Sequence, residues 1–125
     1  MIVWKRYEHF TEDEFKCHCC GICNVSPEFL EKLTEAREIA GIPFNINSGC
    51  RCKKHNKEVG GNIYSQHLTS KLTECSAADI KCNTDRKRFI IVEALIDAGF
   101  THLGISKKDL FIHVDLDSRK AIWLY

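Results

Sequence analysis

Residues 111–116 read FIHVDL, and apolar and polar side chains alternate along them. Successive side chains of a strand point to opposite faces. Ile112 and Val114 therefore share one face, whereas His113 and Asp115 lie on the other. An apolar face can pack on a core and leave the polar face free, so this stretch predicts a strand that carries a site on a sheet.

The rest of the chain alternates between helical and extended patterns. Residues 26–40 have apolar side chains at helical spacing, with Ser26 as the cap and Gly41 at the end. The second long helix, 85–98, contains FIIVEALI, which is apolar nearly all round and predicts deep burial. Shorter segments predict a helix at 53–59 and strands at 43–49, 77–81 and within 101–125. The pattern predicts an α+β fold, a small antiparallel sheet with helices packed on one side.

The chain has 125 residues, which fits one domain, 1–125, and a monomer is the default expectation for it. The formal net charge is +1 and the charges are interspersed, which gives no support to a nucleic-acid or membrane partner. No apolar run reaches the length of a membrane span. The first residues lack a basic segment followed by an apolar one, so no signal peptide is expected.

Two of the six histidines have an aspartate placed near them. His113 shares a strand face with Asp115, and His67 precedes Asp79 in the stretch SQHLTSKLTECSAAD. Histidine and aspartate are zinc ligands, and a catalytic zinc keeps three protein ligands and one open position. Each segment alone is also compatible with a polar loop or a locally hydrogen-bonded strand.

The order of the motifs resembles a known family. SGCRCKKHNKEVGG (48–61), SQHL (65–68), AADI (77–80), FIHVDL (111–116) and a terminal WLY follow one another, after Phe15, Cys17 and Cys19. This order is similar to that of the zinc D-Ala-D-Ala carboxypeptidases and L-Ala-D-Glu endopeptidases that trim peptidoglycan, whose fold is shared with the hedgehog signalling domain. The resemblance covers nearly the whole chain and implies a hedgehog/DD-peptidase-like fold.

The resemblance also implies roles for individual residues. It makes His67, Asp79 and His113 the zinc ligands and gives Arg51 the task of binding a substrate carboxylate or stabilising the oxyanion. A structural ion pair is the alternative for Arg51. Ser65 and Gln66 flank the first ligand, where they would orient it or touch substrate.

Three features depart from the family pattern. The family aspartate follows the histidine by seven positions, whereas twelve separate His67 from Asp79, so LTECS (72–76) is interpreted as an inserted loop at the rim of the site. Ser70 replaces a family glycine. Many relatives also carry an acid three residues before the last histidine, where this chain has Leu110.

Because Leu110 stands where many relatives carry an acid, three other carboxylates are candidates for the catalytic base. Asp115 is favoured as the base or as a residue supporting a ligand, because it shares the strand face of His113. Asp109 is the second candidate and Asp117 the third. A base must reach the water that attacks the peptide bond.

Eight cysteines form the other unusual feature of the sequence. Six of them could form disulfides or a structural zinc site, or remain free thiols: Cys17, Cys19, Cys20, Cys23, Cys50 and Cys52. The spacing of Cys20 and Cys23 is that of a zinc knuckle. A link between this cluster and the SGCRC turn would brace the segment that carries Arg51.

The sequence therefore predicts a zinc peptidase that hydrolyses amide bonds in peptidoglycan stem peptides containing D-amino acids. It would be a carboxypeptidase or an endopeptidase, such as a phage lysin or a wall-remodelling enzyme. The alternative is a catalytically inactive zinc-binding interaction module of the same fold. Action on the cell wall implies a periplasmic or extracellular location, or release at lysis.

Overall fold

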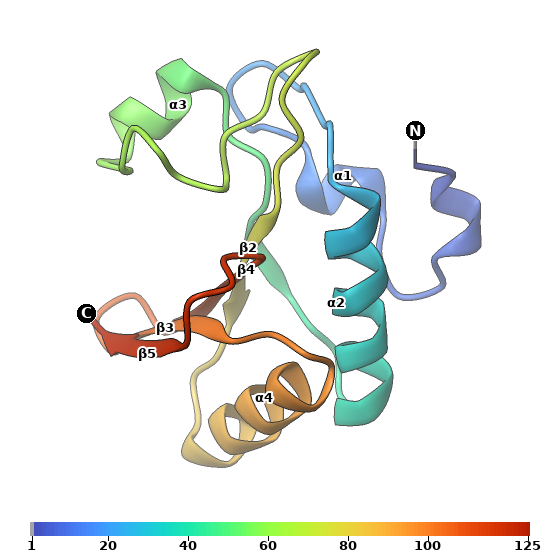
Figure 1. The fold of residues 1–125 in the computed structure, drawn as a ribbon, viewed down its shortest axis with the longest axis vertical. Helices are drawn as coiled ribbons and strands as arrows, with labels where there is room; N and C mark the ends of the chain where they lie inside the picture. Colours follow the sequence, from blue (N-terminus) through green and yellow to red (C-terminus); the bar gives the residue numbers. More distant parts are fainter. Residues whose placement is uncertain (1) are drawn as a thin grey trace.

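The computed structural model describes residues 2–125. Its elements follow the order η1 Trp4–Arg6, α1 Glu12–Phe15, α2 Pro27–Ala40, β1 Ile46–Ser48, α3 Lys53–Glu58, β2 Ala77–Lys81, α4 Asp85–Asp97, β3 His102–Ser106, β4 Phe111–Asp115 and β5 Ala121–Leu124 (Figure 1). The mixture of helices and one sheet confirms the predicted α+β class.

The five strands form one sheet in the order β1-β2-β4-β3-β5. The pairs β1–β2, β2–β4 and β3–β4 are antiparallel, whereas β5 runs parallel to β3. The sheet is therefore mostly antiparallel, in agreement with the predicted fold, and the pair β3–β5 is its one parallel pairing among the described residues. Strand β4 ends at Asp115, beside the first residue of β3. The following loop crosses to the other edge of β3, so β5 also begins beside His102 and runs parallel to β3.

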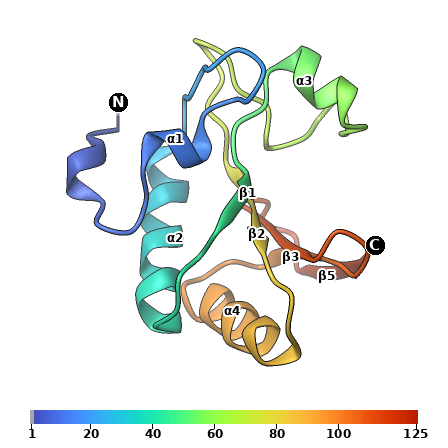
Figure 2. The same cartoon turned by 180° about the vertical axis from the view of Figure 1, so that it is seen from behind.

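The two long helices, α2 and α4, pack against each other and cover one face of the sheet (Figures 1 and 2). Strand side chains on that face are fully buried, among them Ile80, Ile112 and Val114. The short helix α3 lies on the opposite side of β1 and β2 from α2 (Figure 2). The second face of the sheet is thus left to the polar residues of the strands and to the segment around α3.

Helix α2 begins and ends as its sequence predicts. The Ser26 hydroxyl accepts a hydrogen bond from the Phe29 N–H at 3.3 Å, and Gly41 adopts the left-handed conformation that stops the helix, with φ 67°.

None of the helices in residues 2–125 combines the length and the apolar character that a membrane span needs.

The predicted deep burial of the second long helix is wrong. Ile91, Ala94 and Leu95 of α4 are buried, but Phe89 is 67% exposed and Ile96 is 48% exposed. The helix touches α2 and the sheet along one stripe only, and no element covers its outer side within residues 2–125. Although α4 has apolar residues on nearly every side, only the side that faces α2 and the sheet is buried.

Candidate metal centre and active-site cavity

Three side chains from separate parts of the chain converge on the open face of the sheet. Asp79 of β2 lies directly opposite His113 of β4 in the antiparallel register, and His67 reaches them from the loop before β2. His67 Nε2 lies 3.2 Å from Asp79 Oδ1 and 3.2 Å from His113 Nδ1. His113 Nδ1 lies 3.0 Å from Asp79 Oδ1. The three atoms thus form a nearly equilateral triangle.

His67 is held by the loop that follows β1. Its Nδ1 lies 2.6 Å from the carbonyl oxygen of Gly49. A carbonyl can only accept, so Nδ1 carries a proton, and Nε2 is the nitrogen that faces Asp79 and could bind a metal. Gly49 itself packs on Phe15 so closely that a β-carbon would lie 2.9 Å from the Phe15 backbone. Glycine at this position therefore lets the carbonyl reach His67.

His113 is oriented in the same way from its other side. Its Nε2 donates to Asp115 Oδ2 at 2.7 Å, which turns Nδ1 toward Asp79. Burial opposes protonation of His113, but its hydrogen bonds with Asp115 and Asp79 outweigh this and raise its pKa to about 9 in the absence of metal. Asp115 also accepts from His102 Nδ1 at 2.9 Å and from the Asp117 N–H at 2.9 Å.

Asp79 combines burial with strong charge compensation. Its Oδ2 accepts from Arg51 Nη2 at 3.1 Å, and Oδ1 faces the two histidines. Burial favours the neutral acid, but hydrogen bonds with His113 and His67 outweigh it and hold the pKa of Asp79 well below its usual range. Asp79 is therefore an anion at neutral pH, as a metal ligand must be.

This geometry fits zinc. Zinc–nitrogen and zinc–oxygen bonds of about 2.0–2.1 Å give a tetrahedron with edges of about 3.3 Å, close to the 3.0–3.2 Å between the three atoms. Both histidines have their second nitrogen bonded to an oxygen, as is typical of zinc ligands. Three protein ligands leave a fourth position for water or substrate.

Residues 8–115 match the family described as Peptidase M15. The chain belongs to the M15 peptidases. No curated protein matches the chain. Peptidases of this family depend on zinc, and His67, Asp79 and His113 of this M15 peptidase form a group that could hold it.

The group of His67, Asp79 and His113 opens into a cavity of about 500 Å³. Besides the three converging residues, its lining includes Arg51, Ser65, Asp109, Trp123 and Tyr125. Asp109 is exposed in the turn between β3 and β4, and its N–H donates to Ser106 Oγ. Asp109 and Asp79 are the carboxylates among the lining residues. Asp115 and Asp117 instead line a different hollow.

Arg51 is fixed by three neighbours. Its Nε donates to Ser48 Oγ at 3.0 Å, its Nη1 to Asn56 Oδ1 at 3.4 Å and its Nη2 to Asp79. Arg51 thus forms the structural ion pair that was the predicted alternative, with Asp79, and it also lines the cavity. A guanidinium has five N–H groups, so two remain for a ligand.

Ser65 and Gln66 differ in their surroundings. Ser65 lines the cavity, and its hydroxyl accepts the His67 N–H at 3.1 Å. The Gln66 side chain instead accepts the N–H of Leu116 at 3.2 Å, and Gln66 is not among the lining residues of the described chain. The structure therefore brings Ser65 to the centre and turns Gln66 to the end of β4.

Trp123 is a cavity residue that the sequence did not single out beyond the terminal WLY. It lies across β3 from His113 in the row Asp79–His113–Gly104–Trp123. Its ring centroid is 5.5 Å from that of His113. A β-carbon on Gly104 would lie 2.5 Å from the indole, so the glycine leaves room for this ring beside the metal centre.

The interpretation of residues 72–76 as a rim loop is wrong for Cys75, whereas residues 72–74 are exposed. Leu72 is 96% exposed, as a loop residue would be, but Cys75 is fully buried. Cys75 donates its N–H to the Asn24 carbonyl at 2.7 Å and accepts the Ser26 N–H at 2.8 Å. Cys75 thus joins the core beside the start of α2, where its backbone pairs with Asn24 and Ser26 before the chain enters β2.

The structure places six of the eight cysteines in two groups, and all eight are free thiols. Cys17, Cys20 and Cys52 have sulfur atoms within 4.8 Å of one another. The sulfur of Cys50 lies 2.7 Å from that of Cys75 in the core, and Cys23 contacts Cys50. The knuckle spacing of Cys20 and Cys23 therefore does not bring those two together: Cys20 groups with Cys17.

Proposed function

We propose that this M15 peptidase hydrolyses amide bonds in peptidoglycan stem peptides that contain D-amino acids. The observation that carries the proposal is the convergence of His67 Nε2, Asp79 Oδ1 and His113 Nδ1 within 3.2 Å of one another. They lie in a cavity that also contains a cation, Arg51, and a second carboxylate, Asp109. Together these groups can supply a metal site, a cation for the oxyanion and a base, which suits amide hydrolysis.

Zinc held by the three residues would polarise the substrate carbonyl and lower the pKa of water. We assign the general base to Asp109 rather than to Asp115. Asp109 lines the cavity, and no described residue forms an ion pair with it. In this assignment the Asp109 carboxylate takes a proton from the attacking water and passes it to the leaving amine as the C–N bond breaks.

Asp115 supports a ligand in this proposal. Both of its oxygens already accept hydrogen bonds, from His113 on one side and from His102 and the Asp117 N–H on the other. A carboxylate engaged in this way fixes the tautomer and the orientation of the His113 ring. Asp117 pairs with Arg119, with a contact of 2.6 Å, and takes no part in the reaction.

Arg51 would bind the negative charge of the substrate. Its guanidinium lines the cavity beside Asp79 and has two N–H groups to spare. Such a group suits a terminal carboxylate or the oxyanion that develops during attack. Ser65 stands nearby as a neutral donor for the peptide backbone.

A catalytically inactive zinc-binding module of the same fold is the second candidate. The observation that favours it is the leucine at position 110, where many relatives carry an acid. The two candidates differ in one respect, since a binding module would hold zinc but cleave nothing. Asp109 is the residue on which this difference depends.

The test measures bound zinc and release of amine from purified muropeptides. Wild type should bind zinc and cleave, His67→Ala should lose cleavage and the zinc bound at this site, and Asp109→Asn should keep that zinc and lose about 100-fold or more in rate. Asp97→Asn, an exposed carboxylate at the end of α4, is the matched control. Zinc binding without cleavage of any muropeptide would support the inactive module, and full activity in Asp109→Asn would exclude it as the base.

A further inference from the structure

Residues 17–21, CHCCG, form a closed turn at the surface. The Gly21 N–H donates to the Cys17 carbonyl at 2.8 Å, and the Cys17 N–H donates to the Ile22 carbonyl at 2.9 Å. Gly21 has φ 77°, which is the left-handed conformation that lets the chain reverse. The turn brings Cys17 and Cys20, three positions apart, within reach of a common point.

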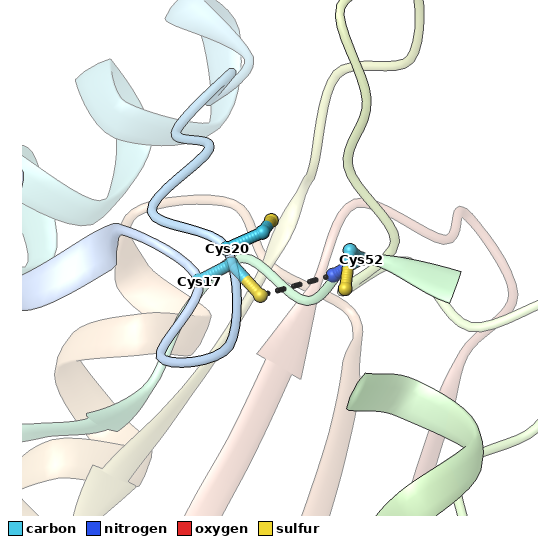
Figure 3. A group of neighbouring side chains, drawn as sticks. All are labelled: Cys17, Cys20 and Cys52. Carbon is cyan, nitrogen blue, oxygen red and sulfur yellow. Dashed lines mark hydrogen bonds between the residues drawn. The ribbon is translucent and has the colours of Figure 1, made fainter. Parts of the chain in front are cut away.

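Cys52 approaches the same point from a distant part of the sequence. Its N–H donates to the Cys17 sulfur at 3.3 Å (Figure 3). Cys52 is also the cap of α3, where its sulfur accepts the His55 N–H at 3.4 Å. The sulfurs of Cys17, Cys20 and Cys52 therefore lie within 4.8 Å of one another, apart from the His–Asp–His centre.

We propose that Cys17, Cys20 and Cys52 bind a second, structural zinc ion, with Cys19 as the fourth ligand. Zinc–sulfur bonds of about 2.3 Å give sulfur–sulfur edges of about 3.8 Å, so the three sulfurs need to move by only about 1 Å. Cys19 is exposed in the same turn and directly precedes Cys20. Four thiolates and no open position are typical of structural rather than catalytic zinc.

The surroundings of the Cys17 sulfur suit a metal ligand. The Cys17 sulfur is buried and accepts the N–H of Cys52 at 3.3 Å, a contact that favours a thiolate. The other cluster behaves differently. The contact with Cys50 and then burial raise the pKa of Cys23 well above its usual range, so this thiol stays protonated.

The site would act as a brace for the catalytic cavity. It would tie the N-terminal segment to Cys52, and Cys52 directly follows Arg51. The Arg51 backbone is paired on its other side with the His67 segment, through its N–H to the His67 carbonyl and its carbonyl to the Thr69 N–H. Fixing Cys52 therefore restricts the loop that carries Arg51 without placing a cysteine in the cavity.

The first test is zinc content per chain together with cobalt spectra. Wild type should hold about two zinc ions, and both Cys17→Ser/Cys20→Ser and His67→Ala/His113→Ala should hold about one. Thiolate-to-cobalt charge-transfer bands should be absent only in the cysteine variant. Cys82→Ser, which changes a buried thiol far from the cluster, should match wild type. Unchanged zinc and unchanged bands in Cys17→Ser/Cys20→Ser would overturn the proposal.

A second test uses the wild-type protein and does not depend on folding of a variant. Native chains are alkylated with and without a strong chelator, and each cysteine is then located by peptide mapping. Cys19, Cys20 and Cys52 should react at least about tenfold faster after chelation, because metal-bound thiolates are protected. Equal rates, or a native disulfide between Cys17 and Cys20, would overturn the site while leaving the His–Asp–His centre unaffected.

Discussion

His113 Nε2 lies 2.7 Å from Asp115 Oδ2, on the side of the imidazole ring that faces away from His67 and Asp79. The two residues sit two positions apart on one strand, and their hydrogen bond decides which nitrogen of His113 can bind a metal. It also engages an oxygen of Asp115, the carboxylate that the sequence favoured as the base. Asp115 is therefore better suited to hold a ligand than to move a proton.

Replacing Asp115 with asparagine should weaken zinc binding about 10- to 100-fold, because the ring of His113 loses its charged partner. The measurement is the zinc dissociation constant by competition with a chelating dye, with activity assayed separately at saturating zinc. Activity should recover substantially at high zinc if Asp115 only positions the ligand. Asp117→Asn, which breaks an exposed pair with Arg119, should change affinity less than about threefold. Loss of activity at full zinc occupancy would instead make Asp115 the base.

Replacing Arg51 with lysine should lower kcat/KM about 10- to 100-fold. A lysine cannot reproduce the fork that reaches Ser48, Asn56 and Asp79 at once, and a lost hydrogen bond to a charged group costs about 1.5–3 kcal/mol. Steady-state kinetics on muropeptides would show this, with Arg119→Lys as the matched exposed control. Unchanged kinetics with reduced stability would leave Arg51 as a structural ion pair only.

The metal-free protein should be most stable between about pH 4 and pH 6.5. The pKa of His113 is raised from its unfolded value of about 6.5 to about 9, so its contribution is complete below about 6.5 and is lost as pH rises through 9. The pKa of Asp79 is lowered, so its contribution is present above about 3.9 and is lost as pH falls. The other groups that face His113 are His67 and Asp115, with His102 behind Asp115.

Urea denaturation in chelator over a pH series tests this profile. The variant His113→Asn should lose much of the decline between pH 6.5 and 9, which separates the histidine from cysteine thiols that titrate in the same range. An equally steep decline in both proteins would show that His113 is not responsible.

Replacing Cys75 with serine should destabilise the chain by about 1–3 kcal/mol, because it places a hydroxyl in a fully buried site. Leu72→Ser, three residues earlier and 96% exposed, should change the free energy of unfolding by less than about 0.5 kcal/mol. Denaturation midpoints of the two variants under reducing conditions give the comparison. Similar small effects would restore the interpretation of 72–76 as a simple surface loop.

Local patterns in the sequence determined much of the fold. The alternation in FIHVDL placed His113 and Asp115 on one face of β4, and the cap and stop signals located α2. These features depend on the residue period and on neighbours in the chain, which are fixed by backbone geometry alone. The exposure of Phe89 on α4 could not be predicted in this way, since it depends on whether another element covers that side.

The tertiary structure decided how distant residues meet. Twelve positions separate His67 from Asp79, and the chain between them passes through the core at Cys75, yet their side chains lie 3.2 Å apart. The tertiary structure also brings Cys17, Cys20 and Cys52 together. It places Asp115 in a hydrogen bond with His113, whereas Asp109 lines the cavity. Sequence spacing cannot give these outcomes, because a loop of given length can follow many paths and the packing of the core selects one.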